Sequence, residues 1–139
     1  MNYSNLFPPN YSLILATFPK CEELKPVFAY GDTIYNPFWV EVRKDVEKHE
    51  EVHSKRQGKD PDLWWNKYLT DRDFRLEEEL IACAIQYKFL KDTLGSSKLT
   101  DWALENIATS LSGELYNLGI SFGEVKSKIR NRAKVVLTN

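Results

Sequence analysis

The chain has 139 residues, which is enough for one domain (residues 1–139) with a substantial buried core. Its 19 basic and 20 acidic side chains are interleaved, so the formal net charge of −1 argues against a nucleic-acid partner or an anionic membrane surface. The N-terminal residues lack the pattern of a secretory signal, and no apolar run approaches the ~20 residues of a membrane-spanning helix. We therefore expect a cytoplasmic protein with reduced cysteines at Cys21 and Cys83.

The first quarter of the chain is predicted to form an extended arm and two strands. Residues 1–10 are polar and contain Pro8 and Pro9, which favours an arm. An apolar run over residues 11–18, closed by Pro19, predicts a first strand. Residues 26–35 predict a second extended stretch around Gly31 and Asp32, so that the two strands can pair as a hairpin.

An amphipathic helix is predicted to begin at residue 38 and to continue through residue 53 as far as residues 56–57. Asn36 is the expected N-cap, Pro37 the first helical residue and Gly58 the C-cap. At about 100° per residue, the buried side of this helix contains both His49 and His53. Both imidazoles are therefore expected to point inward.

These two histidines belong to an H-E-x-x-H motif, His49-Glu50-Glu51-Val52-His53, and the chain has no others. One buried histidine is usually explained by a hydrogen bond in the core, but two of them need several partners for their ring nitrogens. Residues four apart on a helix lie about 6 Å apart at Cβ, which allows two imidazoles to bind one Zn²⁺. Glu50 then lies where it can take a proton from a water molecule beside the metal.

Four further helices are predicted downstream, which makes the expected fold an α+β domain with four to five helices and a two- or three-stranded sheet. The first covers residues 61–69 after Asp60 as cap, and Trp64, Trp65 and Tyr68 are its core anchors. The others cover residues 74–94, a segment from the cap Thr100 to residue 111, and a segment from the cap Ser121 to residue 132. Residues 134–139 are expected to form a short strand or a frayed end.

A catalytic zinc site needs a third protein ligand, which must come from outside the motif. Carboxylates at the start of the 74–94 helix are the candidates, and Cys83 is a weaker one. Glu77 lies on a charged side of the helix and Glu78 lies far from its apolar arc, as expected for an exposed acidic first turn. Glu79 borders the apolar arc next to Cys83. We therefore favour Glu79 as the third ligand, with Glu77 as the alternative.

These residues resemble the gluzincin metallopeptidases, and more closely the small zincin-like proteins of bacteriophages and prophages. The resemblance covers about residues 27–130, and its motifs are Gly31 with Ile34-Tyr35, the H-E-x-x-H motif, Trp64-Trp65 with Tyr68, Phe74-Arg75, Glu79-x-x-Ala82, and Leu111-Ser112-Gly113 with Tyr116. It implies a zincin-like minidomain with His49, His53 and Glu79 as zinc ligands and Glu50 as general base. The chain departs from the family at Ile81 and Cys83, where a second acid and a tyrosine are frequent.

The resemblance also implies a function, hydrolysis of a peptide or protein substrate, for which phage virion proteins are candidates. Tyr116 and Arg75 are the candidate donors to the oxyanion of the reaction. The segment with Gly31, Thr33, Ile34 and Tyr35 is where zincins hold an extended peptide by strand addition. The alternative is a non-catalytic, zinc-stabilised phage assembly or interaction protein located in the host cytoplasm or the virion. Glu50 favours the enzyme, because a structural zinc site needs no acid there.

Overall fold

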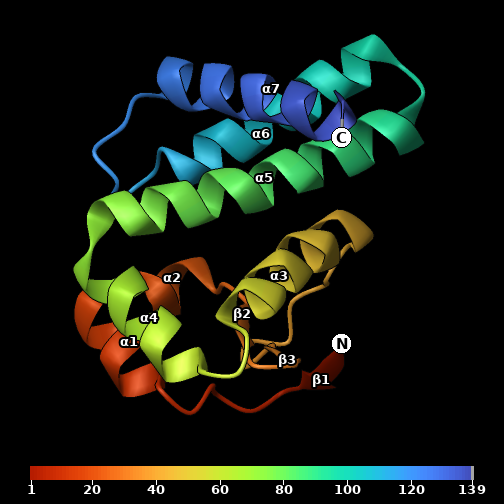
Figure 1. Ribbon diagram of the computed structural model, residues 1–139. Helices are drawn as coiled ribbons and strands as arrows, with labels where there is room; N and C mark the ends of the chain where they lie inside the picture. The colour runs from red at the N-terminus through yellow and green to blue at the C-terminus, as the bar shows by residue number, and fades with distance from the viewer. Residues whose placement is uncertain (139) are drawn as a thin grey trace.

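The computed structural model describes residues 1–138, which form an α+β fold (Figure 1). The elements in chain order are β1 (Asn2–Ser4), α1 (Tyr11–Thr17), α2 (Cys21–Leu24), β2 (Phe28–Tyr30), β3 (Thr33–Tyr35), α3 (Lys44–Gln57), α4 (Pro61–Thr70), α5 (Arg72–Leu94), α6 (Ser97–Leu111) and α7 (Phe122–Thr138). The described chain thus has seven helices, two more than expected, because α1 and α2 are added at the N-terminal end. None of the helices within residues 1–138 is long and apolar enough to span a membrane.

The long helix α5 runs through the middle of the molecule and separates two hydrophobic cores (Figure 1). Helices α6 and α7 pack on one side of α5, and their shared core is aliphatic, with Leu104, Val125 and Ile129 fully buried. Helix α3, helix α4 and the sheet lie on the other side, where the core is built mainly from aromatic rings, Trp64, Trp65 and Tyr68 among them. Helix α5 therefore lies between two apolar regions.

The sheet has three short strands in the order β1-β3-β2. Strands β2 and β3 form an antiparallel hairpin closed by Gly31 and Asp32, and Gly31 has the positive φ of 60° that such a two-residue turn requires. Strand β1 pairs with β3 in parallel, with Tyr3 opposite Ile34. The expected pairing of residues 11–18 with residues 26–35 is therefore wrong, since the hairpin forms within residues 28–35. Part of the expected N-terminal arm becomes an edge strand.

The prediction of a strand over residues 11–18 is wrong, because this segment forms the helix α1. Its buried positions are Ile14 and Phe18, with Tyr11 and Leu15 partly buried. This i, i+3, i+4, i+7 spacing is that of a helix that buries one side, whereas a strand would bury alternate residues. The continuous apolar run concealed the helical period.

The predicted start of the helix that carries the H-E-x-x-H motif is also wrong, since α3 begins at Lys44 with Arg43 as its N-cap residue. The Asn36 side chain accepts a hydrogen bond from the Val40 backbone N–H and donates one to the Val40 carbonyl, which closes a loop instead of capping a helix. Trp39, within this loop, has a positive φ of 56°. Phe38 accordingly packs against Phe7 and not along the face of α3.

Most other helix boundaries follow their predicted caps. Asp60 accepts a hydrogen bond from Leu63 N at the start of α4, and Gly58 ends α3. Helix α6 starts earlier than predicted because Ser96 is its N-cap, while the Thr100 hydroxyl donates to the Ser96 carbonyl. Ser121 accepts from Glu124 N at the start of α7, as predicted. Helix α7 then extends to Thr138, so residues 134–138 form no strand, and residue 139 lies outside the described part of the chain.

Candidate metal centre

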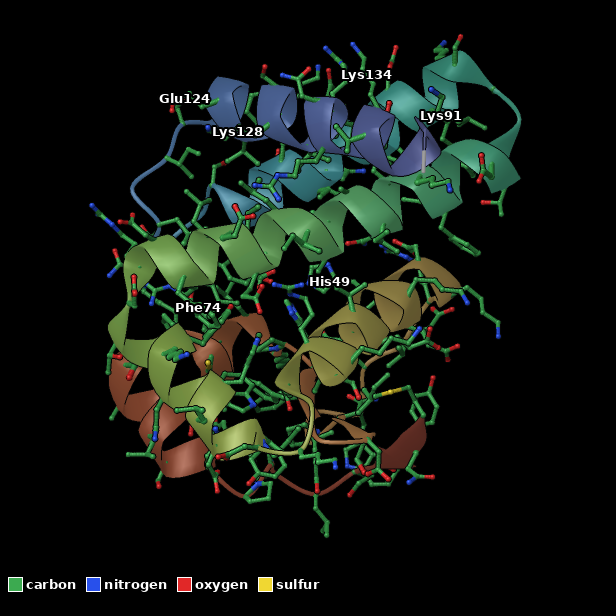
Figure 2. The ribbon with its side chains drawn as sticks, in the orientation of Figure 1. His49, Phe74, Lys91, Glu124, Lys128 and Lys134 are labelled. Atoms are coloured by element: carbon green, nitrogen blue, oxygen red, sulfur yellow. The ribbon has the colours of Figure 1, made fainter. Side chains whose placement is uncertain are left out.

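The two histidines of α3 and one glutamate of α5 meet where these helices pack together. His49, His53 and Glu79 are only 8%, 5% and 2% exposed. Figure 2 shows His49 extending from α3 into the space beneath α5. The spacing of four residues puts both imidazoles on the same face of α3, as the motif predicts. Glu79 reaches them because it lies on the face of α5 that turns towards α3.

The two Nε2 atoms and the two carboxylate oxygens of these residues form a compact cluster, in which each histidine nitrogen lies beside a different oxygen of Glu79. His49 Nε2 lies 3.1 Å from Glu79 Oε2, and His53 Nε2 lies 3.2 Å from Glu79 Oε1. The two Nε2 atoms lie 3.1 Å apart. In a tetrahedral zinc site with bonds of about 2.0–2.1 Å, ligand atoms lie about 3.3–3.4 Å from one another. The arrangement therefore fits a zinc ion closely.

Polar atoms in this cluster lack the partners that a buried site normally supplies. Two ring nitrogens face each other, although two neutral imidazoles can share only one proton between them. Among the described residues, Glu79 Oε2 has no hydrogen-bond partner other than the nearby His49 nitrogen, and the buried His53 Nδ1 has none. Unpaired buried polar atoms cost free energy. A cation held between the three residues would remove most of this cost.

The charge state of Glu79 also suits a metal ligand. Burial raises the pKa of the Glu79 carboxyl, but the charge of His53 and hydrogen bonds from both histidines outweigh burial and hold the pKa well below its usual range. Burial lowers the pKa of His49, but Cys83 and Glu79 outweigh it and raise the pKa above that of a free histidine. The carboxylate is therefore ionised, which is the form that binds a metal.

The three acids at the start of α5 have three different environments. Glu77 is about half exposed and pairs with Arg132 of α7. Since α7 and α3 pack on different sides of α5 (Figure 1), Glu77 lies away from the histidines. The expectation that Glu78 is solvated is wrong, because its buried carboxylate accepts hydrogen bonds from Trp64 Nε1 at 2.7 Å and Arg56 Nε at 2.6 Å. Glu79 alone of the three lies beside the imidazoles.

Cys83, the weaker candidate for a third ligand, also lies close to the site. Its sulfur, a His49 nitrogen and a Glu79 oxygen fall within 4.8 Å of one another, so these three buried residues could hold a metal. However, Cys83 Sγ approaches His49 Nδ1, at 3.8 Å, whereas Glu79 approaches His49 Nε2. These nitrogens lie on different sides of the ring, and burial raises the pKa of the thiol. We therefore favour His53 over Cys83 as a partner of His49 and Glu79.

Tyr68 contacts the site directly, although the sequence had suggested only a core role. Its hydroxyl donates a hydrogen bond of 2.6 Å to Glu79 Oε1. The ring stacks on Trp64 with 4.9 Å between centroids, which holds the hydroxyl in place. Burial, above all, and the Glu79 charge raise the Tyr68 pKa, so the hydroxyl keeps its proton. Ile81 and Cys83 stand where the resembling family often has a second acid and a tyrosine. In this chain Tyr68 of α4 provides a hydrogen bond that orients Glu79.

Gln86 and Asp45 form a second set of contacts that sequence reasoning missed. His49 Nδ1 lies 2.9 Å from Gln86 Oε1, and Gln86 Nε2 donates to Asp45 Oδ2 at 2.8 Å. Arg43 in turn pairs with both Asp45 oxygens. The helical period offered a signal, because Asp45 precedes His49 by one turn and Gln86 follows Glu79 by two turns on the same faces.

Glu50 shares a small cavity with the three candidate ligands. The cavity has a volume of ≈ 50 Å³, and its wall includes His49, His53, Glu79 and Tyr116. Burial raises the pKa of Glu50, while the neighbouring histidines and a backbone hydrogen bond from Ala29 act in the opposite direction. Glu50 therefore has the position and the environment of a basic carboxylate beside the site.

A groove of ≈ 840 Å³ adjoins this cavity. It is bordered by α3, α5, α6 and the loop after α6, and it shares six residues with the cavity, namely Pro26, Val27, His49, Glu50, Leu115 and Tyr116. Its wall also includes apolar side chains, among them Leu90, Leu94 and Trp102. Its volume lies within the range of about 300–1,000 Å³ found for ligand sites. The groove thus offers a route to the candidate ligands.

The two candidate oxyanion donors have different positions. Tyr116 lines both the cavity and the groove, and burial raises its pKa well above the usual value, so its hydroxyl stays protonated. Arg75 does not line either space. Its guanidinium donates to the carbonyl oxygens of Tyr68 at 2.7 Å, Tyr116 at 2.9 Å and Asn117 at 3.3 Å. Arg75 therefore anchors the Tyr116 loop and is not available as an oxyanion donor.

Strand addition at residues 31–35 does not fit the topology. Thr33, Ile34 and Tyr35 form the central strand β3, which is paired on both edges, and the Ile34 side chain is fully buried. Gly31 is also engaged, since its N–H donates to Gln57 Oε1 and its carbonyl accepts from Ser54. Gln57 Nε2 also donates to the Ala29 carbonyl of β2. Helix α3 therefore covers the outer edge of the hairpin.

The comparisons with known proteins add no relative from which a role could be transferred. The geometry of His49, His53, Glu79 and Glu50 is consequently the basis for any functional argument, together with the motif resemblance. No protein-family model matches the sequence, and neither a curated protein nor a solved structure matches the chain significantly.

Proposed function

We propose that this protein is a zincin-like, zinc-dependent metallopeptidase in which His49, His53 and Glu79 hold the metal. The observation that carries the proposal is the buried cluster of both Nε2 atoms and the Glu79 carboxylate, with contacts of 3.1–3.2 Å and an acid of the motif beside it. When bound, Zn²⁺ would polarise the scissile carbonyl and lower the pKa of a water molecule. All remaining steps belong to side chains of this chain.

Glu50 is the proposed general base. It lines the same cavity as the ligands, and burial raises its pKa. A carboxylate whose pKa lies closer to the working pH is a stronger base. Glu50 takes a proton from the attacking water and then passes it to the nitrogen of the leaving amine.

Tyr116 is the proposed donor to the oxyanion. Its raised pKa keeps the hydroxyl proton available for a hydrogen bond. Arg75 supports this role indirectly, because it binds the Tyr116 carbonyl and thereby holds the backbone of the loop. The oxyanion donor and its support thus come from different elements.

The substrate is a peptide or protein segment that reaches the site through the groove between α3, α5 and α6. The groove is the larger space that adjoins the cavity, and Tyr116 and Glu50 border both. Apolar lining residues such as Leu94 and Trp102 suit the apolar side chains of a polypeptide. The phage resemblance makes virion proteins the first substrates to assay.

The proposal is tested by a matched pair of variants of adjacent residues. Glu50→Gln should keep the zinc and the fold but lose the base, with a rate loss of about 10²-fold or more on denatured protein substrates. Glu51→Gln is the control, because Glu51 lies at the surface and pairs with Lys48. It should retain both zinc and activity. Equal activity in the two variants would refute the role of Glu50.

Metal analysis separates the enzyme from the alternative function. Protein purified without chelator should contain about one zinc per chain. A zinc-loaded wild type that cleaves no member of a broad substrate panel would favour the non-catalytic, zinc-stabilised protein. A folded, metal-free protein whose melting temperature does not change on addition of zinc would overturn the metal site itself.

A further inference from the structure

We infer that Gln86 and Asp45 are positioning residues that determine which nitrogen of His49 faces the metal. The inference rests on the proposed zinc site. It goes beyond the ligands and the base, because neither Gln86 nor Asp45 belongs to the H-E-x-x-H motif or to Glu79-x-x-Ala82. Both border the groove next to His49, and we expect them to affect the metal through His49.

The contacts form one continuous chain from the exposed Arg43 through the buried Asp45 and Gln86 to His49. Arg43 Nε lies 3.0 Å and Nη2 3.2 Å from the two Asp45 oxygens. Asp45 Oδ2 accepts from Gln86 Nε2 at 2.8 Å, and Gln86 Oε1 lies 2.9 Å from His49 Nδ1. Asp45 is 3% and Gln86 7% exposed, so water has little access to either.

The charge of Asp45 fixes which group donates and which accepts in each of these hydrogen bonds. Burial raises the pKa of Asp45, but hydrogen bonds from Arg43 and Gln86 outweigh burial and lower it, so the carboxylate is ionised and can only accept. Gln86 must therefore turn its N–H towards Asp45 and its carbonyl oxygen towards His49. A carbonyl oxygen accepts only, so His49 Nδ1 must carry a proton. The nitrogen left to bind a metal is Nε2, which faces Glu79 and His53.

The relay explains why an amide stands between a carboxylate and a histidine. A carboxylate is a frequent partner of a metal-binding histidine, and loss of such a partner typically weakens metal binding 10–100-fold. Asp45 lies on α3, one turn before His49, and its contact to His49 is made through a side chain of α5. Because Glu79 is also on α5, one helix supplies both a ligand and the group that orients the facing ligand.

This argument is tested by variants that reverse the direction of the hydrogen bonds between Asp45, Gln86 and His49. In Asp45→Asn, the Gln86 amide can turn round and present N–H to His49 Nδ1, which places the ring proton on Nε2. The zinc Kd should rise about 10–100-fold. In the double variant Asp45→Asn/Gln86→Glu, the new amide donates to the new carboxylate, which again accepts from His49 Nδ1. The zinc Kd should return to within a few-fold of the wild-type value. A purely structural role predicts no such recovery.

Two measurements on the full chain read out the relay without an activity assay. Competition with a chelator of known affinity gives the zinc Kd, and ¹⁵N NMR of the zinc-loaded protein identifies the coordinating nitrogen of His49. Wild type and the double variant should coordinate through Nε2. Gln86→Leu, which removes the relay and introduces no charge, should weaken zinc binding as much as Asp45→Asn, even if the latter folds poorly.

The control is Gln57→Leu, which removes a buried glutamine of α3 that binds β2 and not His49. It should lower the stability to urea and leave the zinc Kd of the folded protein unchanged. Unaltered zinc binding in Gln86→Leu, or no recovery in a folded double variant, would overturn the relay. A wild type that binds no zinc would instead refute the proposed function, so the two failures are distinguishable.

Discussion

The Tyr68 hydroxyl donates a hydrogen bond of 2.6 Å to Glu79 Oε1 and thereby joins α4 to the buried carboxylate of α5 that faces both histidines. The same oxygen lies 3.2 Å from His53 Nε2. Trp64 packs on both rings, since its centroid lies 5.3 Å from that of His53 and 4.9 Å from that of Tyr68. The aromatic core of the N-terminal half therefore orients the candidate metal ligands.

Tyr68→Phe is expected to weaken zinc binding about 10–100-fold, because Glu79 loses the contact that orients it. The metal-free protein should lose about 1.5–3 kcal/mol of stability, the usual value of a hydrogen bond to a charged group. Chelator competition and urea unfolding measure the two effects. Tyr87→Phe, in the aliphatic core on the other side of α5, is the control and should leave the zinc Kd unchanged.

Glu79→Gln and Glu77→Gln distinguish the two candidate third ligands. Glu79→Gln should lose stoichiometric zinc, since an amide is a poor zinc ligand and the negative charge is removed. Glu77→Gln should retain one zinc per chain, because Glu77 pairs with Arg132 on another side of α5. Elemental analysis after gel filtration decides the matter. Loss of zinc only in Glu77→Gln would mean that the wrong acid is assigned.

In His53→Ala, the stability of the fold should no longer depend on added zinc. In the wild type, free zinc at 100 times its Kd should stabilise the fold by about 2.7 kcal/mol, and a chelator should remove this gain. In His53→Ala the melting temperature should not respond to either addition, because one of three ligands is missing. Thermal scans with and without zinc measure the response. An equal zinc-dependent shift in both proteins would place the metal elsewhere.

Tyr116→Phe should lower kcat about 10²–10³-fold if its hydroxyl binds the oxyanion, with little change in KM. The zinc content should stay at one per chain, because Tyr116 is not a ligand. Steady-state kinetics on a cleaved substrate and elemental analysis provide the two values. A rise in KM with constant kcat would show that Tyr116 binds the substrate uniformly and has no special role in the transition state.

Arg75→Met should destabilise the fold without a direct effect on zinc. Three backbone carbonyls lose their donor, and each one left buried and unpaired costs about 1–3 kcal/mol. Urea unfolding of the metal-free protein measures the loss. Arg72→Met, an exposed position on the same helix, should change the stability by no more than about 0.5 kcal/mol. A similar loss in both variants would contradict the anchoring role.

The sequence alone located the features that depend on residues close together in the chain. His49 and His53 share a face because they are four residues apart, and this holds wherever α3 begins. Asp60 and Ser121 form their predicted caps because a side chain and a backbone N–H three residues later meet locally. The helical period of apolar residues in α5 likewise distinguished Glu79, at the edge of the apolar arc, from Glu77, on the charged side.

The tertiary structure decided the features that depend on distant partners. The run of residues 11–18 carried no usable period, and α1 forms because Ile14 and Phe18 pack on the aromatic core. Strand β1 needs β3, some thirty residues away, to complete its hydrogen bonds. Residues 38–43 stay out of α3 because the Asn36 side chain binds Val40 instead.

The same division applies to the site. The motif itself marks two candidate ligands and a candidate base, since their spacing on one helix brings them together. Tyr68, Gln86 and Arg75 acquire their contacts only when α4, α5 and the loop after α6 pack around α3. A side chain that orients a ligand across a helix interface has no required spacing in the sequence. Helical period and local hydrogen bonds therefore determined which candidate site residues lie together. Long-range packing decided which side chains orient them.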